Sequence, residues 1–246
     1  MPLSRFTDFT AEDCVLLSQR IDIWQYPLHI EFAKAKSLLN DAEIIRANRY
    51  HFARHQRRFT VARSVMRLIL ARYLNVNPEE LEFGYNPQGK PFLSNAPTLQ
   101  FNLSHAGDWA LLAVGSGAPL GIDLEFFSAR PYEGIGSHIF SARENQSLQQ
   151  LPASLKPLGF FHLWAQKEAL IKACGLGLSY PTKQFDVPLL PPAQITLVDP
   201  KFNHTWQISS FMPEAACCAA ICYHPDIQEV RYLKLGNVGA MLGHNV

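Results

Sequence analysis

The sequence is short of charged residues and has no long apolar run. Charged side chains make up 17% of the 246 residues, against a typical share of about 25%, which argues against a long disordered tail. Acids and bases almost balance, and the formal net charge of +1 excludes a globally basic nucleic-acid-binding protein. No apolar run approaches the roughly 20 residues that a membrane helix needs. We therefore expect no membrane partner and, from the overall charge, no nucleic-acid partner.

Cysteines are also few. Five of them form an odd set without a Cys-x-x-Cys pair, which predicts reduced thiols rather than a disulfide framework or a zinc site. The first residues lack the basic and then apolar segment of a secretion signal. Because 48% of the residues are hydrophobic, a sizeable core is available. We expect a globular, cytoplasmic protein.

Apolar periodicity predicts two long helices, at 54–74 and 159–174, and a short one near 141–150. Strands are expected at 81–85, 98–104, 109–114 and 120–126, with four or five more between 183 and 235. The three strands from 98 to 126 are joined by short loops, which suggests an antiparallel meander. Together these elements predict the α+β class.

The segment 128–158 carries several prolines and glycines around its short helix and is the best candidate for a link between two lobes. We predict an N-terminal lobe over 1–127 and a C-terminal lobe over 128–246. The two lobes would be similar, each with a small, mostly antiparallel sheet packed on one long helix.

Two carboxylates share one face of the strand predicted at Gly121-Ile-Asp-Leu-Glu125. Residues two apart in a strand point to the same side, so Asp123 and Glu125 project together. Paired carboxylates near a strand end are suitable ligands for a hard cation such as Mg²⁺. The alternative is a solvated strand face, which this segment alone favours.

A third carboxylate lies in the helix at Trp164-Ala-Gln-Lys-Glu-Ala-Leu-Ile-Lys172. Glu168 falls on a stripe with aromatic and apolar residues, and a carboxylate there needs a partner because its burial alone is costly. One reading is a simple helical ion pair between Glu168 and Lys172. The other makes Glu168 a metal ligand or a base, with Lys172 holding a phosphate.

Arginine is concentrated in one stretch. Residues 44–78 contain no Asp or Glu and eight arginines, at positions 46, 49, 54, 57, 58, 63, 67 and 72. Such one-sided charge indicates a surface that faces an anion, and the arginine fork suits phosphate. Some of these side chains must be structural, and we expect two or three to contact phosphate.

Ser104 and His105 are adjacent, like a nucleophile and its base. Neighbouring strand residues point to opposite faces, however, so the pair is poorly placed to form a mutual hydrogen bond. The Gly-x-Ser-x-Gly turn of hydrolases is also absent. We predict that both side chains contact a ligand instead.

Five segments, taken together, resemble the 4′-phosphopantetheinyl transferases of the long, surfactin-synthetase-activating (Sfp) type. They are Gly84-Tyr-Asn-Pro-Gln-Gly-Lys-Pro91, Phe101-Asn-Leu-Ser-His-Ala106, Gly121-Ile-Asp-Leu-Glu125, Phe140-Ser-Ala-Arg-Glu144 and Trp164-Ala-Gln-Lys-Glu-Ala-Leu-Ile-Lys172. They occur in the order and at the spacing of that family, over about residues 43–187. The resemblance implies a monomeric enzyme of two similar lobes that binds coenzyme A in the cleft between them.

The implied activity is transfer of phosphopantetheine from coenzyme A to a serine of an apo acyl or peptidyl carrier protein, with release of 3′,5′-ADP. The resemblance also assigns residues. It makes Asp123, Glu125 and Glu168 the ligands of Mg²⁺ and directs Lys172 to the pyrophosphate of coenzyme A. Its remaining coenzyme contacts are Lys90, Ser104 and His105 along the nucleotide, and Arg46 and Arg58 near the 3′-phosphate.

The implied mechanism is in-line attack by the carrier serine on the β-phosphorus, with Glu168 as the base. At one position the chain departs from the pattern, because Glu43 stands where some members have lysine. The grip on the 3′-phosphate is therefore expected to be weaker or rearranged. Two alternatives remain: another Mg²⁺-dependent phosphotransferase or phosphodiesterase, and a non-catalytic nucleic-acid-binding protein.

Overall fold

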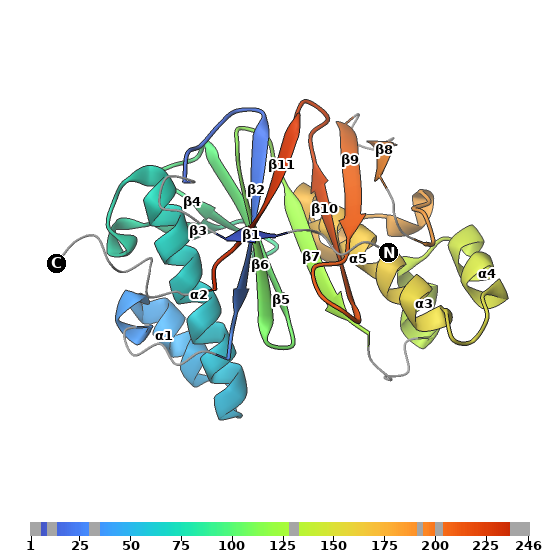
Figure 1. The fold of residues 1–246 in the computed structure, drawn as a ribbon, viewed down its shortest axis with the longest axis horizontal. Coiled ribbons are helices and arrows are strands. Elements are labelled where there is room, and N and C mark those ends of the chain that lie inside the picture. The colour runs from blue at the N-terminus through green and yellow to red at the C-terminus, as the bar shows by residue number, and fades with distance from the viewer. Residues whose placement is uncertain are drawn as a thin grey trace.

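Two β-sheets lie face to face, and a long helix covers the outer face of each sheet (Figure 1). The computed structural model describes residues 6–8, 14–29, 35–127, 133–190, 194–199 and 204–236. Helix α2 (Ala53–Leu74) packs on the first sheet, and helix α5 (Lys156–Cys174) packs on the second. The predicted α+β class with two similar halves is confirmed.

The first sheet has five strands in the order β1-β11-β2-β6-β5. They are β1 (Thr7–Asp8), β11 (Glu229–Lys234), β2 (Arg20–Pro27), β6 (Trp109–Ser116) and β5 (Leu99–Ala106). Strands β2, β6 and β5 pair antiparallel, whereas β11 runs parallel to both of its neighbours. A separate hairpin of β3 (Phe83–Tyr85) and β4 (Pro91–Leu93) contacts this sheet at β5.

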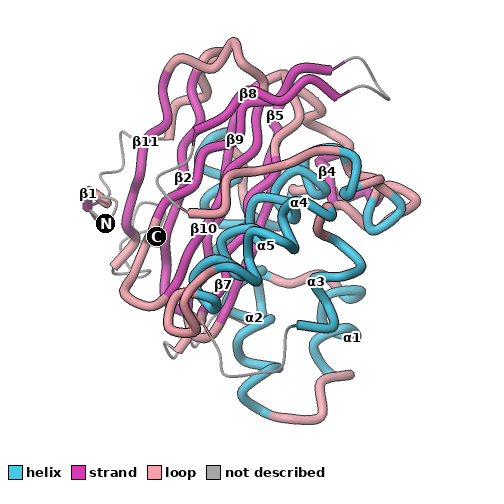
Figure 2. Tube along the Cα trace, turned by 90° about the vertical axis from the view of Figure 1, so that its right-hand side faces the viewer, coloured by secondary structure: helices cyan, strands magenta, loops and turns pink. Residues whose placement is uncertain are grey.

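The second sheet is antiparallel, in the order β7-β10-β9-β8. Its strands are β7 (Gly121–Phe126), β10 (Cys217–Tyr223), β9 (His204–Phe211) and β8 (Gln194–Asp199). The short helices α3 (Glu133–Ile139) and α4 (Ala142–Gln150) contact α5 on the side that faces the viewer in Figure 2.

Side-chain caps begin two of the shorter helices. Helix α1 (Asp41–Asn48) starts at Asn40, which exchanges hydrogen bonds with Glu43, and α4 starts in the same way with Ser141 and Glu144. Such capping boxes satisfy two N–H groups that have no partner within the helix. Single 3₁₀ turns are formed by Lys36–Leu38, Pro78–Glu80, Gly177–Ser179 and Thr182–Gln184.

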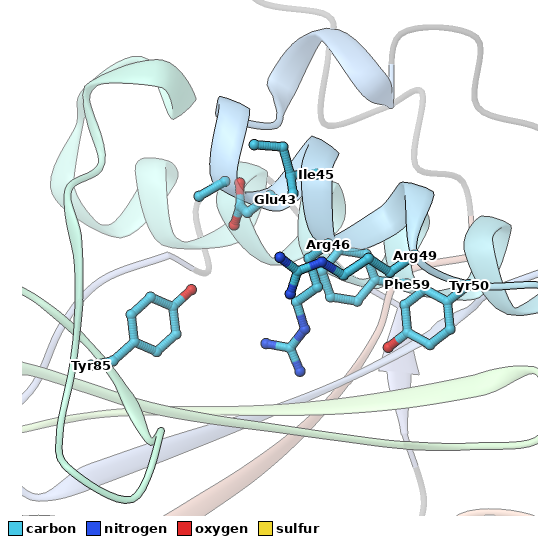
Figure 3. Close-up of a pocket in the computed structure, with 8 residues that line it drawn as sticks. Glu43, Ile45, Arg46, Arg49, Tyr50, Phe59 and Tyr85 are labelled. Atoms are coloured by element: carbon cyan, nitrogen blue, oxygen red, sulfur yellow. The ribbon is translucent and has the colours of Figure 1, made fainter.

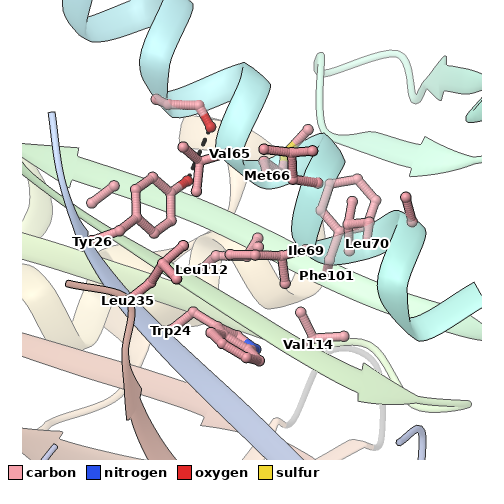
Figure 4. Close-up of a cluster of buried hydrophobic side chains, with 14 of the residues drawn as sticks. Trp24, Tyr26, Val65, Met66, Ile69, Leu70, Phe101, Leu112, Val114 and Leu235 are labelled. Atoms are coloured by element: carbon pink, nitrogen blue, oxygen red, sulfur yellow. Dashed lines mark hydrogen bonds between the residues drawn. The ribbon is translucent and has the colours of Figure 1, made fainter. Parts of the chain in front are cut away.

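Each sheet is buried on both faces. In β2, Trp24 packs with Ile69 of α2 (Figure 4), whereas Ile23 faces the second sheet. Ile122 of β7 joins Ile23 in the core between the sheets, and Leu170 of α5 belongs to the core on the far side of the second sheet. The layers are therefore helix, sheet, sheet and helix, with an apolar core at each contact.

The structure confirms the helices predicted at 54–74, 141–150 and 159–174, and four strands are described between 183 and 235. The predicted three-stranded meander is wrong. Strands β5 and β6 form a hairpin, but β7 crosses to the second sheet and pairs with β10. Alternation shows which face of a strand is buried, not which strand it pairs with.

Strand β11 crosses in the opposite direction, from the second half of the chain into the first sheet. The lobe boundary between 127 and 128 stays a prediction, and part of the predicted link, 128–132, lies outside the described residues. In the described part of the chain, no helix is long and apolar enough to cross a membrane.

Candidate active site

Strand β7 lies directly against α5 because it begins with glycine. A Cβ on Gly121 would overlap the backbone of Ala169 and Ala173 in the helix, so only glycine allows this approach. Asp123 and Glu125, at the next two positions on the same side of β7, both interact with α5 side chains. The alternate residues of β7 belong to the core between the sheets, as the strand period predicts.

Lys172 joins α5 to β7. Its Nζ lies 2.5 Å from Asp123 Oδ1 and donates to Ser104 Oγ at 3.0 Å and to the Ile122 carbonyl at 3.2 Å. Ser104 in turn donates to Asp123 Oδ1 at 3.0 Å. Asp123 is almost fully buried, and its other oxygen, Oδ2, has no hydrogen-bond partner among the described residues. An orphaned carboxylate oxygen in a buried site is costly unless a ligand or a cation completes it.

Glu125 and Glu168 are held close to this pair. Burial and the negative charges of Asp123 and Glu168 raise the pKa of Glu125 to about 7, although Lys172 and a hydrogen bond with Trp164 oppose the rise. Burial and the charge of Asp123 likewise raise the pKa of Glu168. These like-charge effects act between carboxylates of β7 and α5, and a cation bound among them would lower the raised pKa values.

The donor set fits a hard cation such as Mg²⁺, which takes carboxylate oxygens. Asp123 offers an oxygen that no described residue hydrogen-bonds, and Glu125 and Glu168 offer carboxyls whose charge needs compensation. No group of three or more His, Cys, Asp or Glu is arranged to hold a metal ion in the part of the chain that the structure describes. In this arrangement, the positive charge next to Asp123 Oδ1 is the ammonium of Lys172.

Positive charges surround His105, the residue after Ser104. Local desolvation and the charges of Lys172, Arg58 and Arg46 lower its pKa. Strand β5 thus brings His105 to the point where cations from α1, α2 and α5 converge. A neutral imidazole beside three cations is well suited to receive an anionic ligand.

A cavity of about 740 Å³ lies beside these cations, between α1, the start of α2 and the β3 strand. Arg46, Arg49, Tyr50 and Tyr85 are among the residues that line it (Figure 3). The guanidinium of Arg46 lies 5.3 Å from the ring centre of Phe59, another lining residue. Arginines and aromatic rings around one cavity can hold both the phosphate and the base of a nucleotide.

Two arginines of the basic stretch, Arg63 and Arg67, are structural. Arg63 and Arg67 are buried and both pair with Glu43, with Arg67 Nε 2.8 Å from Glu43 Oε2. Glu43 thus pairs with two arginines, caps α1 and also lines the cavity; its effect on the grip of the 3′-phosphate stays a prediction. Arg58 pairs with Asp108 at 2.8 Å in the turn between β5 and β6.

Lys90 lies where the two halves meet. Its Nζ donates to the carbonyls of Leu120, before β7, and Ala173, at the end of α5. Burial lowers its pKa to about 8. Of the predicted site residues, Asp123, Lys172 and Ser104 are in direct contact, and Glu125 and Glu168 interact electrostatically with Asp123 and Lys172. The charges of Arg46 and Arg58 act on His105, whereas Lys90 contacts Leu120 and Ala173.

Two supporting contacts were not predicted. Lys167, next to Glu168, is fully buried and pairs with Glu144 at 3.0 Å, which fixes α4 against α5. Asn102 of β5 accepts a hydrogen bond from the Ile122 backbone at 2.8 Å and holds β7 beside the first sheet. Lys167, Glu144 and Asn102 all lie inside the five segments that resemble the family. The segments therefore pointed to these residues, but their structural roles could not be inferred from the sequence.

Comparison with known proteins matches both halves of the chain. Residues 119–222 match the family model "4′-phosphopantetheinyl transferase superfamily", and residues 23–116 match "4′-phosphopantetheinyl transferase, N-terminal". The chain is 36% identical over 217 residues to the 4′-phosphopantetheinyl transferase HetI of Nostoc sp., covering 84% of this chain and 88% of the relative.

Two Bacillus proteins are also similar. The transferase psf-1 of Bacillus pumilus is 35% identical, over 72% of this chain and 75% of its own length. The transferase Sfp of Bacillus subtilis is 29% identical, over 75% and 82%. The Asp–Glu strand and the Glu–Lys helix lie within the first matched region and the arginine-lined cavity within the second. This chain belongs to the 4′-phosphopantetheinyl transferase family of enzymes.

Proposed function

We propose that this enzyme moves the 4′-phosphopantetheine group of coenzyme A onto a serine of an apo acyl or peptidyl carrier protein, in a Mg²⁺-dependent reaction that releases 3′,5′-ADP. The observation that carries the proposal is the cluster of Asp123, Glu125, Glu168 and Lys172 beside a cationic cavity. It combines carboxylates for a cation with cations for a phosphate, as phosphoryl transfer requires.

Asp123, Glu125 and Glu168 are the residues that would hold Mg²⁺. When bound, Mg²⁺ would neutralise charge that develops on the pyrophosphate of coenzyme A. The support is chemical: in the described part of the chain, Asp123 has one buried oxygen without a hydrogen-bond partner, and Glu125 and Glu168 have a raised pKa.

Lys172 is placed to hold the pyrophosphate, because its ammonium already lies among Ser104, Asp123 and the Ile122 carbonyl. Arg46, Arg58 and His105 would bind the 3′-phosphate and the nucleotide, with the cavity beside Tyr50 and Phe59 for the base. Ser104 would line the same nucleotide site, to which the resemblance also assigns Lys90.

In the reaction, the carrier serine oxygen attacks the β-phosphorus of coenzyme A, and the bond from that phosphorus to the bridging pyrophosphate oxygen breaks. Glu168 takes the serine proton, and 3′,5′-ADP leaves with the electron pair. In the metal-free protein, burial and the charge of Asp123 raise the pKa of Glu168, so this carboxyl binds a proton more tightly than an ordinary glutamate. Positioning and charge stabilisation supply the larger share of the rate.

The carrier protein would dock beside this cluster. Because the arginine-rich stretch carries positive charge, we expect an acidic carrier surface and binding that weakens with salt. We further propose that the enzyme acts as a monomer in the cytoplasm. Since the family consists of enzymes, the non-catalytic nucleic-acid-binding alternative loses its basis.

Intact-protein mass spectrometry tests the proposal. Several apo carrier proteins are incubated with the enzyme, coenzyme A and Mg²⁺, and each should gain the mass of one phosphopantetheine. The gain should disappear with chelator and with Glu168→Ala but persist with Glu79→Gln, which removes an exposed carboxylate elsewhere. If coenzyme A is instead hydrolysed without any carrier modification, the metal-dependent phosphodiesterase alternative is correct.

A further inference from the structure

The turn at residues 86–90 is built to dock on the end of α5. Asn86 Oδ1 accepts hydrogen bonds from the backbone of Gln88 at 3.0 Å and Lys90 at 2.8 Å, which fixes the turn. The Asn86 amide then donates to the carbonyl of Gly175, the residue that ends α5, at 2.7 Å. A turn from the first half of the chain thereby caps a helix of the second half.

The Lys90 side chain makes a second contact with the same helix end. Its Nζ donates to the Ala173 carbonyl at 3.2 Å and to the Leu120 carbonyl at 3.0 Å. The last four carbonyls of a helix have no partner within it, and a cation at this end also opposes the helix dipole. Lys90 therefore satisfies a free carbonyl of α5 and ties it to the residue before β7.

Close packing leaves this contact little freedom. Gly175 has a φ of +68°, and a Cβ there would lie 3.0 Å from Asn86 Nδ2 and 3.4 Å from Lys90 Cδ. Gly177 has a φ of +60°, and a Cβ there would lie 3.7 Å from the Gln88 side chain. Glycine at both positions lets the chain turn away from α5 directly beneath the 86–90 turn.

We propose that Lys90 is a positioning residue which, together with Asn86, clamps the last turn of α5 to β7 and so keeps Lys172 on Asp123. Lys172 directly precedes Ala173, and Asp123 is three residues after Leu120. The clamp thus acts on the backbone next to both partners of the ion pair. In this proposal the Lys90 ammonium holds the helix end and does not contact the nucleotide. The expected effect on kcat rests on the proposed transferase activity.

Two measurements on the full chain test the clamp. The first is hydrogen exchange of the α5 amides without coenzyme A, including Gly175 N, which donates to the Ile171 carbonyl. The second is steady-state kinetics, with KM for coenzyme A separated from kcat. The variants are Lys90→Met and Asn86→Ala, with Lys183→Met as the control because it removes an exposed lysine elsewhere.

We expect both clamp variants to speed exchange at the end of α5 about tenfold or more and to lower kcat, with KM for coenzyme A changed less than about threefold. Lys183→Met should change none of these. A KM for coenzyme A raised tenfold by Lys90→Met, with kcat and exchange unchanged, would assign the ammonium to phosphate binding and overturn the proposal. If Lys90→Met does not fold, Asn86→Ala decides, because it loosens the same helix end without removing a charge. If wild type transfers nothing, the proposed function fails, yet the exchange data still test the clamp.

Discussion

Lys172 of α5 lies 2.5 Å from Asp123 of β7, and this ion pair joins the two elements that carry all three predicted metal-binding carboxylates. The pair is asymmetric. Asp123 is buried, and one of its oxygens has no partner among the residues that the structure describes, whereas 26% of the Lys172 side chain is exposed. The partly exposed Lys172 ammonium can therefore reach a ligand, whereas the buried Asp123 carboxylate stays fixed.

Replacing Lys172 with methionine should abolish measurable transfer while leaving a folded protein. The change removes the cation proposed to hold the pyrophosphate and the ion-pair partner of Asp123, which keeps its hydrogen bond from Ser104. Because Lys172 is partly exposed, we expect a loss of about 1–3 kcal/mol in the free energy of unfolding, measured by urea denaturation. Lys172→Arg should regain most of the stability but little activity, because the guanidinium differs in shape from the ammonium. Transfer by Lys172→Met near the wild-type rate would exclude a role in catalysis.

Glu125 should make Mg²⁺ binding depend on pH near neutrality. With a pKa of about 7 in the folded protein, its carboxyl holds a proton below pH 7 that a cation must displace. The apparent Mg²⁺ affinity should therefore rise between pH 6 and pH 8 and then level off. The measurement is the increase in Tm caused by Mg²⁺ at each pH.

The same group has the opposite effect on the metal-free protein. Between pH 4.5, the usual pKa of a glutamic acid, and pH 7, the folded state binds more protons than the unfolded state, so this contribution to stability decreases as pH rises and is constant above 7. Glu125→Gln should remove both effects. An unchanged Mg²⁺ response in Glu125→Gln would show that this residue does not bind the metal.

Arg46 should discriminate coenzyme A from 3′-dephospho-coenzyme A. It lines the cavity beside His105, where we place the 3′-phosphate. Arg46→Ala should raise KM for coenzyme A about tenfold, since one charged hydrogen bond is worth about 1.5–3 kcal/mol, and should leave KM for the dephospho form nearly unchanged. Arg143→Ala, which removes an exposed arginine in α4, is the matched control. Equal losses with both substrates would place the 3′-phosphate elsewhere.

Gly121→Ala should disrupt the site through packing alone. The added methyl would overlap the α5 backbone and force β7 away from the helix, at a cost of about 1–3 kcal/mol or more. The transfer rate should fall by more than the loss of folded protein explains, because Asp123 and Glu125 move with the strand. The control is Gly134→Ala in α3, where a Cβ meets no atom within 4 Å and no activity should be lost. A Tm and rate like wild type in Gly121→Ala would contradict the close approach of β7 and α5.

The sequence predicted these elements best where a periodic pattern was long. The repeat in 54–74 located α2 almost to the residue, and alternation placed Asp123 and Glu125 on one face of β7. Both inferences depend on local geometry, which a short segment determines. The partner of β7 depends on contacts far along the chain, and the meander was therefore assigned wrongly.

The roles of charged residues were harder to predict. Eight arginines without a nearby acid indicated an anion site, yet Arg63 and Arg67 are paired with Glu43, the residue just before that stretch. Lys167 and Lys172 occupy one helix, but one is buried against Glu144 and the other lies at the site. Spacing along a helix predicts the direction in which a side chain points. It does not predict which charged residue of another element lies in that direction.

Strand β11 crosses into the first sheet and pairs there with β2, a strand far away along the sequence. Arg231 of β11 bonds to Asp22 of β2 across 209 positions, and contacts of such long range slow folding. During synthesis, one edge of β2 therefore stays without its neighbouring strand until β11 has been made. A chain cut at residue 127 would likewise leave each fragment lacking one strand, β11 in the first and β7 in the second. The two fragments should therefore be inactive alone and regain function only when expressed together.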